Sequence, residues 1–183
     1  WQDQAAGERA SAGARFTSLP RPFYIFFTLL GIEWIGTLAF SLSDPQLTFY
    51  IFSDLGWSTV RYGLVAGAYG LMMVLGQLLL GQLSDRLGRK PFILGGLLGY
   101  ALVAVALYHT TQVSLLIAIR FFQGIFSAMM MPVLQAYVGD IAPHGGEGFS
   151  MGLFNMSMFL GLSLGPFLGG VINDRLSLDA AFG

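Results

Sequence analysis

The sequence has 183 residues and contains no cysteine, only two histidines and few charged residues. The lack of cysteine excludes disulfide bonds and thiolate metal sites. His109 and His144 are isolated, and neither an HExxH nor a GxxxxGK[ST] pattern occurs, so metal-dependent hydrolysis and P-loop chemistry lack their minimal residues. The formal net charge of -1 gives no sign of a nucleic-acid partner. We therefore expect no enzyme activity, no cofactor and no metal.

The scarcity of charge points to a membrane protein. Only 10% of the residues are charged and 55% are hydrophobic, whereas soluble domains carry about 25% charged residues. Five apolar runs each approach the roughly 20 residues that cross a bilayer as a helix. They cover about residues 23–42 or 23–52, 62–80, 91–107, 113–138 and 149–172. The predicted fold class is all-α, a polytopic membrane helix bundle with five transmembrane helices.

The first run is ambiguous at its end. It stops near Leu42 or continues past Pro45 to about Phe52, because a membrane helix tolerates proline where neighbouring groups satisfy the freed carbonyl. Residues 1–22 are polar and lack an apolar period, which predicts a disordered cytoplasmic tail. A signal peptide is the rival interpretation, but the following run is too long and carries Glu33. The bundle is expected over residues 23–175, followed by an extracytoplasmic segment, 176–183, that leads to a truncated sixth helix.

The basic residues of the short connections predict the orientation. Six of them fall on the side of the amino terminus, two on the opposite side, and Arg120 lies within a span. The six are Arg9, Arg15, Arg21, Arg86, Arg89 and Lys90, and the two are Arg61 and Arg175. This excess predicts a cytoplasmic amino terminus in an integral, multi-pass protein of the plasma (cell inner) membrane.

Glu33 and Arg120 fall inside predicted spans, and Asp44 does so if the first span continues past Pro45. Glu33 lies about ten residues into the first run, near the middle of the hydrocarbon core, where an ionisable group is costly unless it is paired, neutral or hydrated. It is either functional or a structural hydrogen bond between helices. Asp44 follows eleven residues later, nearly three helical turns, so a continuous helix places both carboxylates on one face. Alternatively, Asp44 begins a turn before Pro45.

Arg120 is the second charge inside a predicted span, in the fourth run. Its guanidinium group stays charged at accessible pH, so it must face protein or an aqueous cavity. We expect Arg120 and Glu33 to stabilise each other across a central cavity, either as part of a working site or as a simple structural pair.

Three stretches resemble sequence elements of one known family. GQLSDRLGRK, between the second and third runs, resembles the cytoplasmic signature loop of the major facilitator superfamily of transporters, and LIAIRFFQGIFSA resembles the family's helix-four element around a membrane-embedded arginine. GLSLGPFLGG resembles the helix-five element of the drug:proton antiporter branches. The loop residues are Gly81, Asp85, Arg86, Gly88, Arg89 and Lys90, the helix-four residues are Arg120 and Gln123, and the helix-five residues are Gly161, Gly165, Pro166, Gly169 and Gly170.

The resemblance covers about residues 23–172 and implies five helices of an amino-terminal six-helix half. The family normally has two such halves, and this sequence begins with Trp1, so we expect a fragment of a longer gene product or a truncated copy. One departure concerns the stretch after the fourth run, which keeps Asp140 but reads HGGEGFS where relatives often place an arginine.

The glycines and charged residues of these elements lead to further expectations about helix packing and ion pairing. Gly81 would allow a close approach of the second and third helices, and Asp85 and Arg89 would pair if that stretch is helical. The resemblance implies that the loop latches against the missing carboxy-terminal half, the alternative being a simple basic anchor. Glycines every four residues in the fifth run would form either a flexible antiporter seal or a tight packing face. Gly63 and Gly67 would also permit close packing.

The resemblance implies a secondary active transporter that exports hydrophobic or cationic small molecules in exchange for protons by alternating access. Glu33 would take up and release the proton and Arg120 would tune it, with Asp44 and Gln123 also in the proton or substrate site. The alternatives are an uptake transporter for a sugar or organic anion, which Arg120 would bind, and a non-transporting truncated membrane protein. The expected partners are the substrate, protons, the lipid bilayer and the missing carboxy-terminal half, with no nucleic acid.

Overall fold

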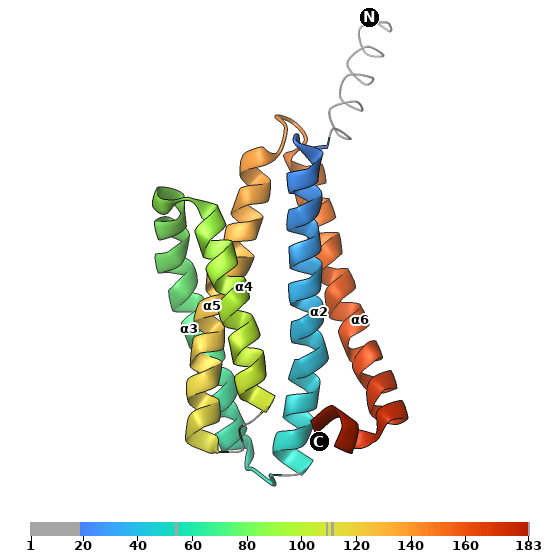
Figure 1. Cartoon of the computed structure of the whole chain (residues 1–183). Coiled ribbons are helices and arrows are strands. Elements are labelled where there is room, and N and C mark those ends of the chain that lie inside the picture. Colours follow the sequence, from blue (N-terminus) through green and yellow to red (C-terminus); the bar gives the residue numbers. More distant parts are fainter. Residues whose placement is uncertain (1–18, 54, 109, 111, 183) are drawn as a thin grey trace, which may run out of the picture.

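The computed structural model describes residues 19–53, 55–108, 110 and 112–182, and these residues form an all-helical bundle (Figure 1). Each of the five helices is long and apolar enough to cross a membrane. Their bounds are α2 Phe23–Ser53, α3 Thr59–Leu87, α4 Arg89–Tyr108, α5 Val113–Ile141 and α6 Glu147–Phe182. The predicted fold class is confirmed. The predicted tail lies mostly outside the described residues.

Two helix boundaries differ from the expectation of short spans separated by loops. α2 continues through Pro45 to Ser53, which selects the longer of the two predicted ends. α3 continues to Leu87, so the prediction of a loop over Gly81–Lys90 is wrong for most of its length. Only Gly88, with a positive φ of 94° that favours glycine, separates α3 from α4. At the other end of the chain, the backbone of α6 stays helical to Phe182, although its apolar span ends at Val171.

Hydroxyl side chains within α2 are satisfied by the helix's own backbone. Thr28, Thr37 and Thr48 each donate a hydrogen bond to the carbonyl oxygen four residues earlier, at distances of 2.7, 2.8 and 3.0 Å. Such bonds let polar residues occur in a helix that water does not reach. The polar residues of α2 therefore do not prevent it from spanning the apolar layer.

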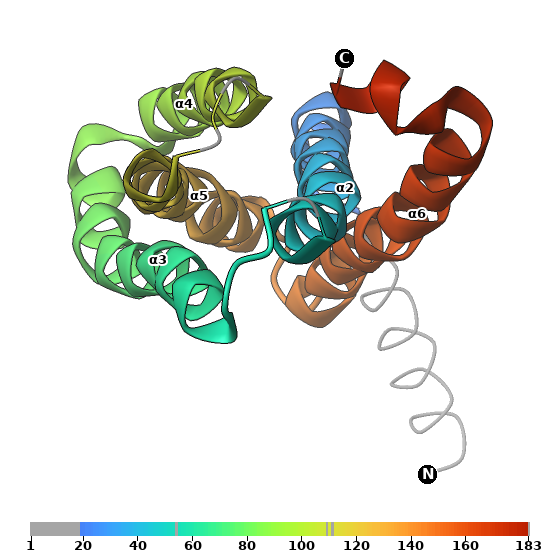
Figure 2. The same cartoon turned by 90° about the horizontal axis from the view of Figure 1, so that it is seen from below.

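α5 is the central helix of one side of the bundle. It packs along α3 and along α4, whereas α3 and α4 scarcely contact each other (Figure 2). α2 packs mainly along α6. The expectation that Gly81 mediates a close approach of α3 and α4 is therefore wrong, and a Cβ atom built there would meet nothing within 4 Å.

Other glycines make the close approaches between helices. A Cβ atom at Gly76 of α3 would overlap Ala128 of α5, and one at Gly124 of α5 would overlap the backbone of Tyr69 on α3. Gly63 and Gly67, by contrast, face no neighbour within 4 Å among the described residues. Small residues do join α3 to α5, but at positions that sequence spacing did not single out.

The glycine face of α6 packs directly against α2. Cβ atoms at Gly161 and Gly165 would overlap the side chains of Thr37 and Ser41 as well as the α2 backbone, and the Ser41 hydroxyl donates a 2.9 Å hydrogen bond to the Gly161 carbonyl. Gly169 is buried on the same face. The tight-packing interpretation of this stripe is supported, while its role as a seal stays a prediction.

We predict that Gly165→Ala destabilises the bundle by about 1–3 kcal/mol, because the added methyl group would collide with Ser41 and the backbone of α2. Gly170→Ala is the matched control, since Gly170 is exposed and has nothing within 4 Å of its Cβ position. Denaturant unfolding in detergent micelles measures both changes. Equal stability of the two variants would show that α2 and α6 do not pack at Gly165 as described.

Candidate functional site

An ion pair between a buried arginine and a partly buried aspartate joins α5 to α2 in the apolar part of the bundle. Arg120 is only 6% exposed, and its Nη2 donates a 2.6 Å hydrogen bond to Oδ1 of Asp44. Its Nη1 donates a 3.0 Å bond to Oε1 of Gln123, one turn further along α5. The guanidinium carbon also lies 5.9 Å from the ring centroid of Tyr69 on α3. Arg120 therefore faces protein, as its charge requires.

The expected pairing of Arg120 with Glu33 is wrong. Glu33 lies eleven residues before Asp44 on the same helix, about 16 Å along the helix axis at 1.5 Å per residue. Because α2 remains helical through Pro45, Asp44 is carried to the level of Arg120 and takes the position expected for Glu33. The alternative of Asp44 as a loop residue is excluded by the same observation.

Glu33 is buried without a side-chain partner for one of its oxygens. The residue is 1% exposed, and its Oε2 has no hydrogen-bond partner in the part of the chain that the structure describes. Thr37 donates a hydrogen bond to the backbone carbonyl of Glu33, which leaves the carboxyl group unaffected. A carboxyl group at this depth is costly when charged and unpaired, so it is a functional candidate by default.

Two tyrosines from different helices extend the polar network around Arg120. The Nε2 of Gln123 donates a 3.1 Å hydrogen bond to the hydroxyl oxygen of Tyr100 on α4. The hydroxyl of Tyr69 lies 3.5 Å from the hydroxyl of Ser127. Sequence reasoning missed both tyrosines, because an aromatic residue in an apolar run gives no signal of which neighbour it contacts.

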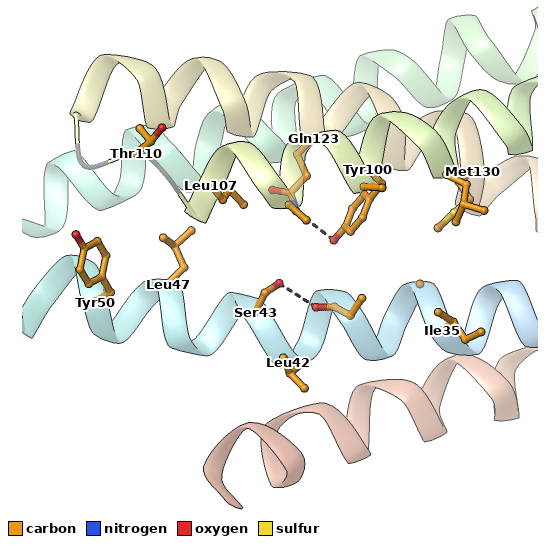
Figure 3. A pocket seen from close by; sticks show the side chains of 15 residues that line it. Ile35, Leu42, Ser43, Leu47, Tyr50, Tyr100, Leu107, Thr110, Gln123 and Met130 are labelled. Atoms are coloured by element: carbon orange, nitrogen blue, oxygen red, sulfur yellow. Dashed lines mark hydrogen bonds between the residues drawn. The ribbon is translucent and has the colours of Figure 1, made fainter. Parts of the chain in front are cut away.

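A cavity of about 660 Å³ lies between α2, α4 and α5. Its wall is mostly apolar, and Tyr100 and Gln123 place hydrogen-bonding groups on it opposite α2 (Figure 3). The lining residues are Ile35, Gly36, Ala39, Leu42, Ser43, Leu47, Tyr50, Leu97, Tyr100, Ala101, Ala104, Leu107, Thr110, Gln123 and Met130. Neither Glu33 nor Arg120 lines it directly.

The signature stretch forms a separate charge cluster where α3 meets α4. Arg89 pairs with Asp85 across the Gly88 break, at 3.0 Å, and its Nε also bonds to Asp140 of α5. The predicted Asp85–Arg89 pair is confirmed, and Asp140 adds a link to a third helix. Arg86 and Lys90 are exposed. The cluster ties α3, α4 and α5 together at one end of the bundle, far from Arg120.

The fold and these contacts define an integral, multi-pass membrane protein with a partly buried ion pair and a buried carboxyl group that has one unpartnered oxygen among the described residues. The sequence matches the Major Facilitator Superfamily over residues 29–183. The chain belongs to this family of membrane transporters.

Several known transporters resemble the chain. An uncharacterized MFS-type transporter of Methanocaldococcus jannaschii is 33% identical over 86% of this chain and 38% of its own length. Multidrug resistance protein 3 of Bacillus subtilis is 34% identical over 72% of this chain and 26% of its own length. The class C tetracycline resistance protein of Escherichia coli is 38% identical over 67% of this chain and 30% of its own length. The chain thus spans about a third of the length of the curated relatives it matches.

Proposed function

We propose that the chain is the amino-terminal part of a secondary active transporter that exports hydrophobic or cationic small molecules in exchange for protons. The observation that carries this proposal is Glu33, a carboxyl group buried in an apolar span with an unpartnered oxygen. Such a group can bind and release a proton without breaking an ion pair. Relatives named for multidrug and tetracycline resistance support the substrate class.

The ion pair between Arg120 and Asp44 supplies the second part of the proposed mechanism. Asp44 neutralises Arg120, so the guanidinium charge is held in the span without attracting the proton-binding carboxyl group. A cationic substrate would compete with Arg120 for Asp44, and Gln123 would hold the released guanidinium on α5. Substrate binding and proton binding then use different carboxylates of one helix.

Alternating access would move these helices as a unit against the carboxy-terminal half of the full-length protein. In this proposal the stretch Gly81–Lys90 faces the cytoplasm and latches that half in one state, and the amino terminus is also cytoplasmic, in the plasma membrane. The Asp85–Arg89–Asp140 cluster supports the latch by fixing the ends of α3, α4 and α5 relative to one another. Lipid would cover the exposed apolar faces of the bundle.

The uptake alternative, with Arg120 binding an anionic substrate, is less well supported. Nη1 and Nη2 already donate to Gln123 and Asp44, and Nε is buried without a partner among the described residues. An organic anion would therefore have to displace a carboxylate at 2.6 Å or reach the buried Nε. The two hypotheses predict different competitors for transport.

We expect the full-length natural protein, reconstituted in vesicles, to move a lipophilic cationic dye against its gradient when a pH jump is imposed. A protonophore should abolish this movement, because the proton gradient supplies the energy. Fluorescence of the dye measures the transport, and unlabelled lipophilic cations should compete while sugars and organic anions should not. Transport that persists with the protonophore, or competition by anions alone, would contradict the proposal.

A further inference from the structure

We infer that Tyr100 is a positioning residue, which holds Arg120 in place through Gln123. The inference deepens the proposed function, since it concerns the arginine of the proposed substrate site. Tyr100 belongs to α4, which contributes none of the charged groups of that site. The link runs from the Tyr100 hydroxyl to Gln123, from Gln123 to Arg120, and from there to Asp44 on α2.

Arg120 fixes the orientation of the Gln123 amide. Arg120 has only donors, so the group of Gln123 that faces it must be the oxygen, and Oε1 accepts from Nη1 at 3.0 Å. This orientation turns Nε2 the other way, where it donates to the Tyr100 hydroxyl oxygen at 3.1 Å. Tyr100 therefore supplies the acceptor for the amide donor that is left over in the orientation that Arg120 needs.

Burial of Gln123 makes its hydrogen bond to Tyr100 costly to lose. Gln123 is 2% exposed, so its amide has little access to water and a lost partner is costly. Without the Tyr100 hydroxyl, the Nε2 donor of Gln123 lacks its acceptor. The Gln123 side chain is then more stable in another orientation, in which Nε2 finds a new acceptor. Arg120 then loses the hydrogen-bond acceptor of its Nη1. It is held by the bond to Asp44 and by the cation–π contact with the ring of Tyr69, which is less directional than a hydrogen bond.

The Tyr100–Gln123 bond joins two helices that pack along each other, α4 and α5. Tyr100 and Gln123 point toward each other across the α4–α5 boundary, on the wall of the cavity (Figure 3). α4 packs along α5 but hardly contacts α3. A shift of α4 along α5 therefore changes the Tyr100–Gln123 bond directly, and α4 acquires a means of acting on a site whose charges all lie on other helices.

The test uses Tyr100→Phe in the full-length natural protein, with Tyr62→Phe as the matched control. Tyr62 also loses a hydroxyl contact between helices, the 3.2 Å bond to Thr48. Thr48 bonds to the backbone carbonyl of Asp44 and not to its carboxylate, so this contact does not involve the side chains that hold Arg120. Nuclear magnetic resonance of isotope-labelled arginine reports the guanidinium group, whose signal is assigned by its loss in Arg120→Lys. We expect Tyr100→Phe to shift and broaden this signal, and Tyr62→Phe to leave it unchanged. An unchanged signal in Tyr100→Phe overturns the inference, whether or not the protein transports a drug.

A mutant cycle tests whether Tyr100 acts through Gln123. We expect Tyr100→Phe to lower the maximal rate of dye transport about fivefold, the equivalent of one hydrogen bond, and to shift its pH profile. In a Gln123→Leu background the same substitution should have no further effect, because the connecting amide is gone. Equal effects of Tyr100→Phe in both backgrounds overturn the inference. Absence of transport in the unmodified protein counts against the proposed function, and the arginine signal then decides the role of Tyr100.

Discussion

Replacement of Glu33 by glutamine is expected to reduce proton-driven transport by roughly 100-fold, because the amide has the same shape but cannot take up and release a proton. The buried site should accept the amide without large loss of stability, since one carboxyl oxygen already lacks a partner in the described part of the chain. Substrate-dependent proton uptake into vesicles is the direct measurement. Downhill movement of substrate without a pH gradient should survive, because it needs no proton exchange.

Glu147→Gln is the matched control for this experiment. Glu147 is an exposed carboxylate at the start of α6, where it accepts a hydrogen bond from Gly145. Its loss changes the net charge by the same amount as Glu33→Gln without altering the membrane interior. Proton-driven transport that is unaffected by Glu33→Gln, or lost equally in both variants, would remove Glu33 from the mechanism.

Replacement of Asp44 by asparagine is expected to destabilise the bundle by about 2 kcal/mol. Removing one partner of a buried ion pair leaves the other charge uncompensated, a loss of roughly 3–5 kcal/mol in full burial. The Asp44 side chain is 35% exposed while that of Arg120 is 7% exposed, so water offsets part of the loss. Unfolding in detergent micelles measures the change, and cation transport should fall with it.

The double variant Asp44→Asn with Arg120→Gln separates pairing from general damage. If the two charges interact, removing both should cost less than the sum of the single changes, because no uncompensated charge remains. Additive losses would show that the 2.6 Å contact contributes little to stability. The cycle is informative here because Asp44 and Arg120 lie on helices far apart in sequence, and no local helix effect links them.

Hydrophobicity alone predicted the helices, because each span is apolar over the thickness of a bilayer and few charges interrupt it. Their ends were harder to predict. Pro45 reads as a helix end in isolation, yet α2 continues through it. Gly81–Leu87 is polar enough to read as a loop, yet it extends α3 by two turns beyond the apolar run. Membrane helices that project beyond the apolar layer leave no hydrophobic signal of their true length.

The partners within the site could not be predicted from spacing. Glu33 and Asp44 share nearly the same helical phase, so periodicity places both carboxylates on one face and leaves open which of them meets Arg120. The register of α2 against α5 decides this, and register depends on side-chain packing across helices. The same limit explains why a Cβ atom at Gly81, a residue chosen for its motif, would meet none of the described residues within 4 Å, while Gly76 and Gly124 make the close contact of α3 with α5.

The central position of α5 bears on how the bundle assembles during synthesis. α3 and α4 emerge before α5 as a pair joined through Gly88, yet they have few contacts with each other and both pack on a helix that has not yet been made. α2 likewise waits for α6, the last of the five. The early helices therefore enter the lipid as separate spans, and their packing begins only when α5 supplies the surface that α3 and α4 share.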